Sequence, residues 1–464
     1  MWTLSHRLAP ALAAAIMATN HLGSLGGGVL VFGSMLAASF ALERSSHPLH
    51  LMPLASAMAR ATVPVAGAGL ALGIFALGGS PQPVAAMMVP VGGAWLVSLF
   101  AGLASTRFAR ERPVRVAVIG SRGLAIGLAE ELSGSGVRSH AMVGWMAGDK
   151  PTRDPGEGGP RLLGSMADLR DVVKLHQIDL LVHGSTNHSD PDEPGQSRLA
   201  VFEQVAASCL DLPVRMIEAN QLYEDLLGHV PLGQSNSAWF QYLMHPRYRQ
   251  GVPGAKRAFD LAVGSLMLAL AAPALALFAL VVKLTDGGAI LYSQRRVGER
   301  GEEFNMIKLR SMSPRAEADG ARWSGADDER VTRVGRLMRS LHIDELPQLW
   351  NVLRGDMTLV GPRPERRELI NELELQLRFY DRRHIVKPGI AGWAQARCGY
   401  GGSEEGTGWK LCHDLYYLKH RSVYFDLMVL IENVRVSLDR GVQFELRTPQ
   451  EQFILGRDAG QPTA

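Results

Sequence analysis

The sequence predicts a membrane protein in three parts: a helical N-terminal bundle of four spans, an α/β middle domain, and a C-terminal domain that carries a fifth apolar segment. Three observations lead to this prediction. Hydrophobic residues make up 47% of the 464 residues, and charged residues only 20%. The apolar residues gather in five long runs instead of being spread along the chain. Between the fourth and fifth runs, short apolar stretches alternate with helical patterns, as in parallel α/β domains.

Charge and cysteine content exclude several classes of protein. Lys and Arg number 48 against 45 Asp and Glu, a net charge of +3, which argues against a nucleic-acid-binding protein that relies on bulk positive charge. The three cysteines, Cys209, Cys398 and Cys412, lie far apart in the sequence, which excludes a disulfide framework and a CxxC zinc site.

The first part, residues 1–106, holds four apolar runs that we interpret as membrane spans. A helix needs about 20 apolar residues to cross a bilayer, and the runs cover residues 8–19, 22–42, 61–79 and 84–104. A signal peptide is the alternative for the short first run, and core helices of a soluble domain are the alternative for all four. Arg44 and Arg60 separate the two pairs, and four arginines follow within residues 107–115, which places both ends of the bundle in the cytoplasm.

The second part, residues 107–250, is predicted to be a small parallel α/β domain of Rossmann-like type. Its candidate strands are residues 114–120, 141–145, 178–183 and 214–217. The glycines after the first strand follow Gly120-x-x-Gly123-x-x-x-Gly127, which differs from the GxGxxG fingerprint of dinucleotide sites. No acidic residue ends the second strand, where a ribose-binding group is expected. We therefore expect no bound cofactor, with a nucleotide site as the alternative.

The fifth apolar run, residues 258–283, is long enough to cross a bilayer, but Pro273 lies in its middle. Proline inside a helix removes a backbone hydrogen bond and clashes with the preceding turn. The residues therefore allow two structures. A kinked helix could cross the bilayer, or the helix could break at Pro273 and return to the face from which it entered.

Charged residues form compact clusters after this run, at residues 304–312, 339–356 and 359–365. In the adjacent pair Asp344-Glu345, like charges repel, so one pKa should rise unless a cation intervenes. Mg²⁺ would relieve this repulsion and also bridge phosphate oxygens. Arginine binds phosphate bidentately, and the nearby candidates are Arg339, Arg354 and Arg363. The set suits phosphoryl transfer, although acidic residues that merely begin a helix are the alternative.

These motifs resemble those of the bacterial sugar transferase family, monotopic membrane enzymes that transfer a sugar-1-phosphate to a polyprenyl phosphate. Larger members of the family place four spans and a degenerate Rossmann-like domain before the transferase domain. The resemblance rests on Lys256-Arg257-x-x-Asp260, Lys308-x-Arg310-Ser-Met, Arg339, Asp344-Glu345-Leu-Pro-Gln-Leu-x-Asn351-Val-Leu-x-Gly-Asp-Met, Gly361-Pro-Arg-Pro and Lys387-Pro-Gly-x-x-Gly392-Trp-Ala-Gln395. Two further stretches, Tyr400-Gly-Gly-Ser403 and Lys410-Leu-x-x-Asp414, resemble an exopolysaccharide-associated branch.

The resemblance implies a reaction in which a UDP-sugar gives its sugar-1-phosphate to undecaprenyl phosphate and releases UMP. It implies that Asp344 is the nucleophile and touches a required Mg²⁺, and that Glu345 is its dyad partner. Arg363 corresponds to the arginine assigned to nucleotide binding in the family. The remaining candidates for phosphate binding are Arg339, Lys308, Arg310 and Arg354. The reaction would be the first step of exopolysaccharide repeat-unit assembly at the bacterial inner (cytoplasmic) membrane.

The resemblance also implies a mostly α-helical transferase domain over residues 251–447, with a re-entrant membrane hairpin that breaks at Pro273, followed by a polar tail at residues 448–464. The location of UDP-sugars agrees, because they are cytoplasmic and a fifth crossing would place Asp344 on the opposite face. The family usually has Ser before this proline, whereas this chain has Ala272.

Two other functions compete with this one. A non-catalytic scaffold or regulator of a polysaccharide export complex is disfavoured by the intact Asp344-Glu345 pair and Arg363. An NAD-dependent oxidoreductase is disfavoured by the glycine pattern of the middle domain. The expected partners are a UDP-sugar (glucose or galactose are usual in the family), undecaprenyl phosphate and membrane lipid, with no nucleic acid. A homo-oligomer is compatible with the sequence.

Overall fold

The computed structural model describes two domains of the chain. It covers residues 112–120, 122–134, 139–147, 159–184, 205, 207–234, 253–286, 288–313, 328–398 and 404–438. The four predicted spans in residues 1–106 and the predicted polar tail at residues 448–464 lie outside the described residues. Apart from residues 424–432, the described residues belong to one compact unit formed by residues 112–423 and 433–464.

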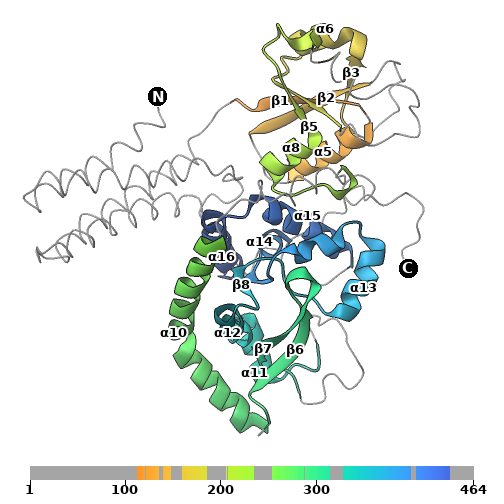
Figure 1. The fold of residues 1–464 in the computed structure, drawn as a ribbon. Coiled ribbons are helices and arrows are strands. Elements are labelled where there is room, and N and C mark those ends of the chain that lie inside the picture. Colours follow the sequence, from red (N-terminus) through yellow and green to blue (C-terminus); the bar gives the residue numbers. More distant parts are fainter. Residues whose placement is uncertain are drawn as a thin grey trace, which may run out of the picture. The chain divides into compact units, whose positions relative to one another are not determined.

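The middle domain is a five-stranded, fully parallel sheet in the order β3-β2-β1-β4-β5 (Figure 1). This is the strand order of Rossmann-like folds as far as five strands go, so the predicted parallel α/β architecture is confirmed. The strands are β1 (Val114–Ile119), β2 (His140–Ala147), β3 (Leu162–Ser165), β4 (Leu180–His183) and β5 (Arg215–Glu218). The helices among them are α5 (Arg122–Gly134) and α6 (Leu169–Leu175).

The core of this sheet explains why its strands consist of apolar runs. Parallel strands with helices on their faces are buried on both sides, and β1 ends in four consecutive buried residues. Ala117, Met146 and Leu181 come from three neighbouring strands, and all three are fully buried in one cluster. The strand β3 was not predicted, because its four residues are only partly buried and include Gly164.

After β5 the chain forms a short irregular helical stretch, residues 219–234, which we call the bridging segment. It contains α8 (Ala219–Leu222), a π-helical turn η3 (Tyr223–Leu227) and a 3₁₀ turn η4 (Leu232–Gln234). Gly228 ends the π-helical turn with φ of +67°, a conformation that glycine adopts without strain.

The C-terminal domain is mostly helical, as expected. Its long helix α10 (Pro253–Asp286) precedes the antiparallel hairpin β6 (Leu291–Val297) and β7 (Glu303–Leu309), which is joined by η6 (Glu299–Gly301). It also contains a two-stranded parallel pair, β8 (Thr358–Val360) and β9 (Gly389–Ala391). The other elements are α11 (Arg333–Ser340), η7 (Ile343–Glu345), α12 (Gln348–Arg354), α13 (Arg367–Gln376), η8 (Tyr380–Ile385), α14 (Trp393–Cys398), α15 (Glu404–His420) and α16 (Val423–Leu438).

The helix α10 is long and apolar enough to cross a membrane over Gly254–Thr285, with a mean hydropathy of 2.5 and only 6% of that window buried. It continues through Pro273 as one helix of 34 residues, and Figure 1 shows that it changes direction about halfway along. The break that the sequence led us to expect at Pro273 is therefore not seen as an end of the helix, and the return to one membrane face stays a prediction.

Both ends of α10 are attached to the C-terminal domain. Near its start, Arg257 donates hydrogen bonds to the carbonyl oxygens of Val352 and Leu353 at 2.6 and 2.7 Å. These carbonyls belong to the last turn of α12, where a cation is favourable. The buried Asp260 accepts a 2.7 Å hydrogen bond from the Thr358 hydroxyl. Near the other end of α10, Val282 packs in a buried cluster with residues of β7 and α11.

Candidate active site

The two adjacent carboxylates lie in η7, between α11 and α12. His342, just before them, has φ of +55°, and this left-handed residue turns the chain from α11 into η7. Asp344 and Glu345 are 7% and 9% exposed. The turn therefore places two acidic side chains in a largely buried setting, where each needs a compensating interaction or a neutral form.

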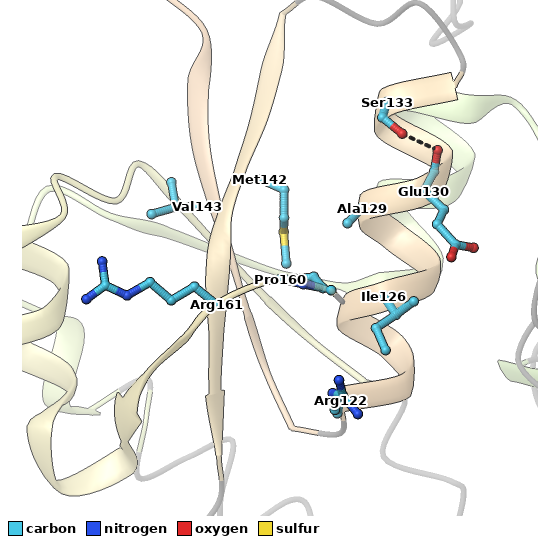
Figure 2. A pocket seen from close by; sticks show the side chains of 10 residues that line it. Arg122, Ile126, Ala129, Glu130, Ser133, Met142, Val143, Pro160 and Arg161 are labelled. Atoms are coloured by element: carbon cyan, nitrogen blue, oxygen red, sulfur yellow. Dashed lines mark hydrogen bonds between the residues drawn. The ribbon is translucent and has the colours of Figure 1, made fainter. Parts of the chain in front are cut away.

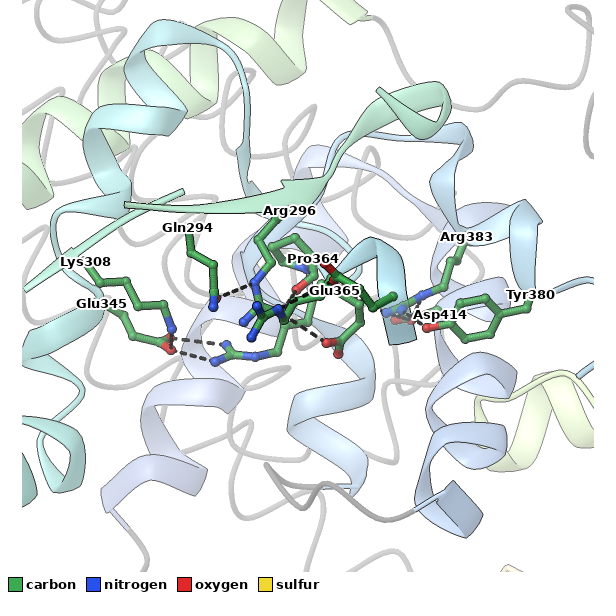
Figure 3. A network of polar contacts seen from close by, with 12 residues as sticks. Gln294, Arg296, Lys308, Glu345, Pro364, Glu365, Tyr380, Arg383 and Asp414 are labelled. Atoms are coloured by element: carbon green, nitrogen blue, oxygen red, sulfur yellow. Dashed lines mark hydrogen bonds and ion pairs between the residues drawn. The ribbon is translucent and has the colours of Figure 1, made fainter. Parts of the chain in front are cut away.

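Glu345 is held by two cations from other parts of the chain (Figure 3). Its Oε1 accepts hydrogen bonds from Lys308 Nζ at 2.7 Å and Arg363 Nη2 at 2.6 Å. Its Oε2 accepts from Arg363 Nη1 at 3.2 Å, so the arginine binds this carboxylate through two nitrogens. Burial would raise the pKa of Glu345, but the charges of Arg363 and Lys308 outweigh it and hold that pKa well below its ordinary value.

Asp344 is in the opposite state. Within the described part of the chain, no hydrogen bond reaches its carboxylate. Burial raises the pKa of Asp344 above its ordinary value and the negative charge of Glu345 adds to this, while Lys308, Arg339 and Arg363 act in the other direction. The neighbouring carboxylates are thus divided into one that fixes two cations and one that stays available for chemistry.

The loop that carries Arg363 is held by hydrogen bonds to its backbone carbonyl oxygens. Arg383, in η8, donates a 3.0 Å hydrogen bond to the carbonyl oxygen of Arg363. Tyr417 Oη donates a 2.7 Å hydrogen bond to the carbonyl oxygen of Val360, at the other side of the loop. Glu345, Arg363 and Arg383 thereby belong to one continuous polar network (Figure 3).

Arg339 lies in the last turn of α11, where its Nε donates a 3.0 Å hydrogen bond to the hydroxyl of Ser311. That helix begins at Thr332, whose hydroxyl accepts from the amide of Gly335 at 2.9 Å. A side chain at Gly335 would overlap the carbonyl oxygen of Ser311. Glycine at this position lets α11 pack closely against Ser311. Arg339 is then near enough to Asp344 for its positive charge to lower the pKa of that carboxyl group.

Two further predicted substrate-binding residues have contacts outside this group. Arg354, at the end of α12, donates a 2.6 Å hydrogen bond from Nε to Asp356 and is half exposed. The guanidinium of Arg310 lies against Gly288, where a Cβ would overlap it. The structure therefore brings Asp344, Glu345, Lys308, Arg339 and Arg363 together, and the roles of Arg310 and Arg354 stay predictions.

Sequence reasoning missed two ion pairs beside the site, one buried and one partly buried. Arg383 donates to Asp414 on α15, with a 3.0 Å contact from its Nε, and both side chains are buried. Arg296, on β6, donates from Nη1 to Glu365 at 3.3 Å (Figure 3). Neither arginine stands in a motif whose spacing predicts a partner; the only signal was Asp414 within the resemblance near the end of the chain.

The residues present suit a magnesium ion bound mainly through substrate. Within the described ranges there is no group of three or more His, Cys, Asp and Glu side chains that could hold a metal. Magnesium is commonly held by one or two carboxylates together with substrate phosphates and water. Asp344 offers one carboxylate that accepts no hydrogen bond from any described residue, whereas the carboxylate of Glu345 is occupied by Lys308 and Arg363.

A separate pocket of about 760 Å³ lies beside α5 in the middle domain (Figure 2). Figure 2 shows Ile126 and Ala129 on one side and Met142 and Pro160 on the other. The three glycines of the turn after β1 are not among the residues that line it. Gly120 has φ of +124°, and a Cβ there would meet nothing within 4 Å. That glycine serves the backbone turn, and whether the domain binds a nucleotide stays a prediction.

Comparison with known proteins gives a consistent picture. Residues 252–440 match the family model described as bacterial sugar transferase. A UDP-glucose:undecaprenyl-phosphate glucose-1-phosphate transferase of Caulobacter vibrioides is 38% identical over 224 residues, covering 47% of this chain and 84% of that protein. A UDP-N-acetylgalactosamine-undecaprenyl-phosphate N-acetylgalactosaminephosphotransferase of Aeromonas hydrophila is 34% identical over 300 residues, covering 64% of this chain.

An undecaprenyl-phosphate glucose phosphotransferase of Komagataeibacter xylinus is 43% identical over 188 residues, which cover 39% of this chain. The chain spans 63% of the Aeromonas protein and 35% of the Komagataeibacter protein. In all three comparisons, the similarity is to a protein named for sugar-phosphate transfer to undecaprenyl phosphate.

Proposed function

The chain belongs to the bacterial sugar transferase family, and on that premise we propose that it transfers sugar-1-phosphate from a UDP-sugar to undecaprenyl phosphate and releases UMP. The product would begin an exopolysaccharide repeat unit. One observation carries the proposal. Among the described residues, no hydrogen bond reaches the Asp344 carboxylate near Lys308, Arg339 and Arg363, whereas Glu345 forms ion pairs with Lys308 and Arg363.

The reaction divides into two displacements at one phosphorus. In the first, an Asp344 oxygen attacks the sugar-bearing phosphorus of the donor, the bond from that phosphorus to the UMP oxygen breaks, and UMP leaves with the electron pair. In the second, a phosphate oxygen of undecaprenyl phosphate attacks the same phosphorus. The bond to Asp344 then breaks, and the carboxylate is restored.

The charges of the site fit a diphosphate donor with a divalent cation. Lys308, Arg339 and Arg363 carry three positive charges against the two negative charges of Asp344 and Glu345. The net of about +1 leaves part of a diphosphate uncompensated. Mg²⁺, held by Asp344 and the donor phosphates, would supply the missing charge when bound.

Arg363 and Lys308 would orient the donor phosphates, because they are fixed before any substrate arrives. Glu345 holds both cations with contacts between 2.6 and 3.2 Å. Preorganised donors of this kind stabilise charge in the transition state without reorganisation. Glu345 would then act by placing Lys308 and Arg363.

We also propose that α10 enters and leaves the membrane on the cytoplasmic face. Its two ends are attached to one domain, through Arg257 and Asp260 at the start and Val282 at the end. Between these attachments, α10 changes direction about halfway along (Figure 1). Pro273 lies between the attached ends and supports a bend. The Ala272 that replaces the family's usual Ser removes one hydroxyl from this bend.

Apolar side chains near the dyad support the same placement. Leu337 and Leu341, at α11 and just after it, are 51% and 49% exposed, and Trp350 on α12 is 56% exposed. Large apolar side chains exposed beside a membrane helix are typical of surfaces that contact lipid. An active site at the inner-membrane surface would meet a water-soluble donor and a lipid acceptor together.

The proposal is tested by UMP release from detergent-purified protein with Mg²⁺, undecaprenyl phosphate and a panel of UDP-sugars. Release with at least one donor is expected, and Asp344→Asn should abolish it while the variant is produced at a normal level. Near-normal turnover by that variant would remove Asp344 as the nucleophile. No release from any donor would favour the non-catalytic scaffold.

A further inference from the structure

The bridging segment connects the middle domain to the C-terminal domain through buried contacts. It follows directly from β5, the edge strand of the sheet. Toward the middle domain, His229 Nε2 lies 3.5 Å from Glu131 Oε1 on α5. Seven apolar residues of the segment are buried: Ala219, Leu222, Tyr223, Leu226, Leu227, Val230 and Leu232.

Toward the C-terminal domain, the segment offers a buried carboxylate to the end of α15. Glu224 is 5% exposed. Its Oε1 accepts a hydrogen bond from Lys419 Nζ at 2.8 Å, and its Oε2 lies 3.1 Å from His420 Nε2. Burial would raise the pKa of Glu224, but His420 and Lys419 together outweigh it and lower that pKa. The ion pair joins residues almost two hundred positions apart in the sequence.

Further backbone and ring contacts join the bridging segment to α14 and α15. The indole Nε1 of Trp393 donates a 2.6 Å hydrogen bond to the carbonyl of Gly228. The amide of Val230 donates to the carbonyl of Cys412 on α15 at 3.1 Å. The ring of His229 meets those of Trp409 and His413 at centroid distances of 5.3 Å. The bridging segment therefore contacts α15 from Trp409 to His420.

The same helix holds the loop that carries Arg363. Asp414 on α15 fixes Arg383, which donates to the carbonyl of Arg363. Tyr417, also on α15, donates to the carbonyl of Val360. α15 thus contacts the bridging segment through some side chains and the loop at residues 361–363 through others, directly at Val360 and by way of Arg383 at Arg363.

We propose that the bridging segment is a positioning element for the donor site, and that Glu224 is its principal positioning residue. This inference rests on the proposed function, because it takes Arg363 as a ligand of the donor diphosphate. Packed interiors transmit displacement because they contain few voids. A shift of α15 would therefore move the backbone of Arg363, and errors of about 1 Å in such groups are costly to binding and catalysis. The middle domain would act on donor affinity by this route.

The experiment measures the affinity of the full-length protein for UDP, the part shared by every UDP-sugar, by titration calorimetry in detergent with Mg²⁺. Glu224→Gln keeps the shape of the side chain and removes its charge. The UDP dissociation constant should rise about fivefold, a size typical of coupling through a packed network. Glu130→Gln, the same change at an exposed position of the middle domain, is the matched control and should leave UDP affinity unchanged.

A double-mutant cycle separates positioning from general loss of stability. On a background that combines Asp414→Asn with Tyr417→Phe, taken as one change of the cycle, both contacts from α15 toward the loop are already interrupted, so adding Glu224→Gln should weaken UDP binding by less than twofold. Full additivity of the two changes, or wild-type affinity in Glu224→Gln, would overturn the inference. If Glu224→Gln does not fold, Lys419→Met removes one partner of the same carboxylate and is judged by the same criteria. Absence of UDP binding by the wild type would instead contradict the proposed function itself.

Discussion

Asp344 and Glu345 show how two neighbours of the same charge acquire different tasks. Adjacency alone predicts that one pKa rises unless a cation intervenes. Both outcomes occur, because Glu345 forms hydrogen bonds with Lys308 and Arg363, whereas no residue that the structure describes forms one with Asp344. Which carboxylate takes which state was not predictable from the sequence. It depends on Lys308 from β7 and Arg363 from the loop after β8 meeting at one side chain, which is a tertiary property.

The two carboxylates should therefore have opposite effects on stability. Because the pKa of Asp344 is raised in the folded protein, the protonated carboxyl group favours folding at low pH. This contribution to the free energy of unfolding is lost as the pH rises through that pKa. At pH 7 its charge costs stability, and Asp344→Asn should raise the free energy of unfolding by an amount on the order of 1 kcal/mol. The lowered pKa of Glu345 has the reverse sign, so its contribution is complete at pH 7 and disappears on acidification through that pKa.

Glu345→Gln should accordingly lower the free energy of unfolding by roughly 3 kcal/mol, because it leaves Lys308 and Arg363 without their shared anion. Thermal unfolding at pH 7 in one detergent measures both variants. Glu374→Gln, at an exposed position on α13, is the control and should change little. Equal destabilisation by Asp344→Asn and Glu345→Gln would contradict the division of roles.

At the scale of elements, the sequence predicted α10 as a membrane helix but left open whether it crosses the bilayer. Length and hydropathy predicted a membrane helix, and Pro273 allowed either a crossing or a return. The attachment of both ends depends on Arg257, Asp260 and Val282 finding partners in α12, β8 and the β7–α11 cluster. Local periodicity does not show contacts between residues more than twenty positions apart. The attachment of both ends of α10 could therefore be recognised only from the folded structure.

Cysteine labelling tests the direction of α10. Ala255→Cys and Ser293→Cys place exposed thiols at the start of α10 and on the strand that follows it. The native cysteines are buried, and burial raises the pKa of Cys398 to about 12, so they should react poorly with maleimide. If α10 returns to the cytoplasmic face, a membrane-impermeant maleimide should label both positions only after cell lysis.

A cysteine at Gln82, between the predicted third and fourth spans, should be labelled in intact spheroplasts and is the positive control. Labelling of Ser293→Cys but not of Ala255→Cys in intact spheroplasts would mean that α10 crosses the membrane.

For the whole molecule, the sequence predicts three parts with a boundary at residue 250 between the second and third, and this boundary stays a prediction. What the sequence did not predict is that residues 219–234 contact the C-terminal domain through Glu224, Gly228 and Val230. Composition gives no warning, because this segment continues the helical pattern after the last strand. Long-range hydrogen bonds decide such a boundary, and they connect residues that no local pattern relates.

Two truncations should differ as a result. A chain that begins at residue 219 keeps the bridging segment, whereas one that begins at residue 241 leaves Lys419, His420 and the Trp393 indole without their partners. The shorter chain should lose about 3 kcal/mol or more of stability and bind donor more weakly. Denaturation in the same detergent measures the first effect, and equal stability of the two chains would show that the segment is dispensable.

The attachment of α10 has a consequence for how the acceptor is found. Arg257 joins α10 to the end of α12, and Asp260 joins it to β8, which leads into the loop of Arg363. In a bilayer, these contacts would hold Asp344 at a fixed height above the lipid surface. An acceptor whose phosphate stays at that height needs no extraction from the membrane. Under the proposed function, it would reach Asp344 by lateral diffusion, so the search would be two-dimensional and its rate would depend on lipid density in the leaflet.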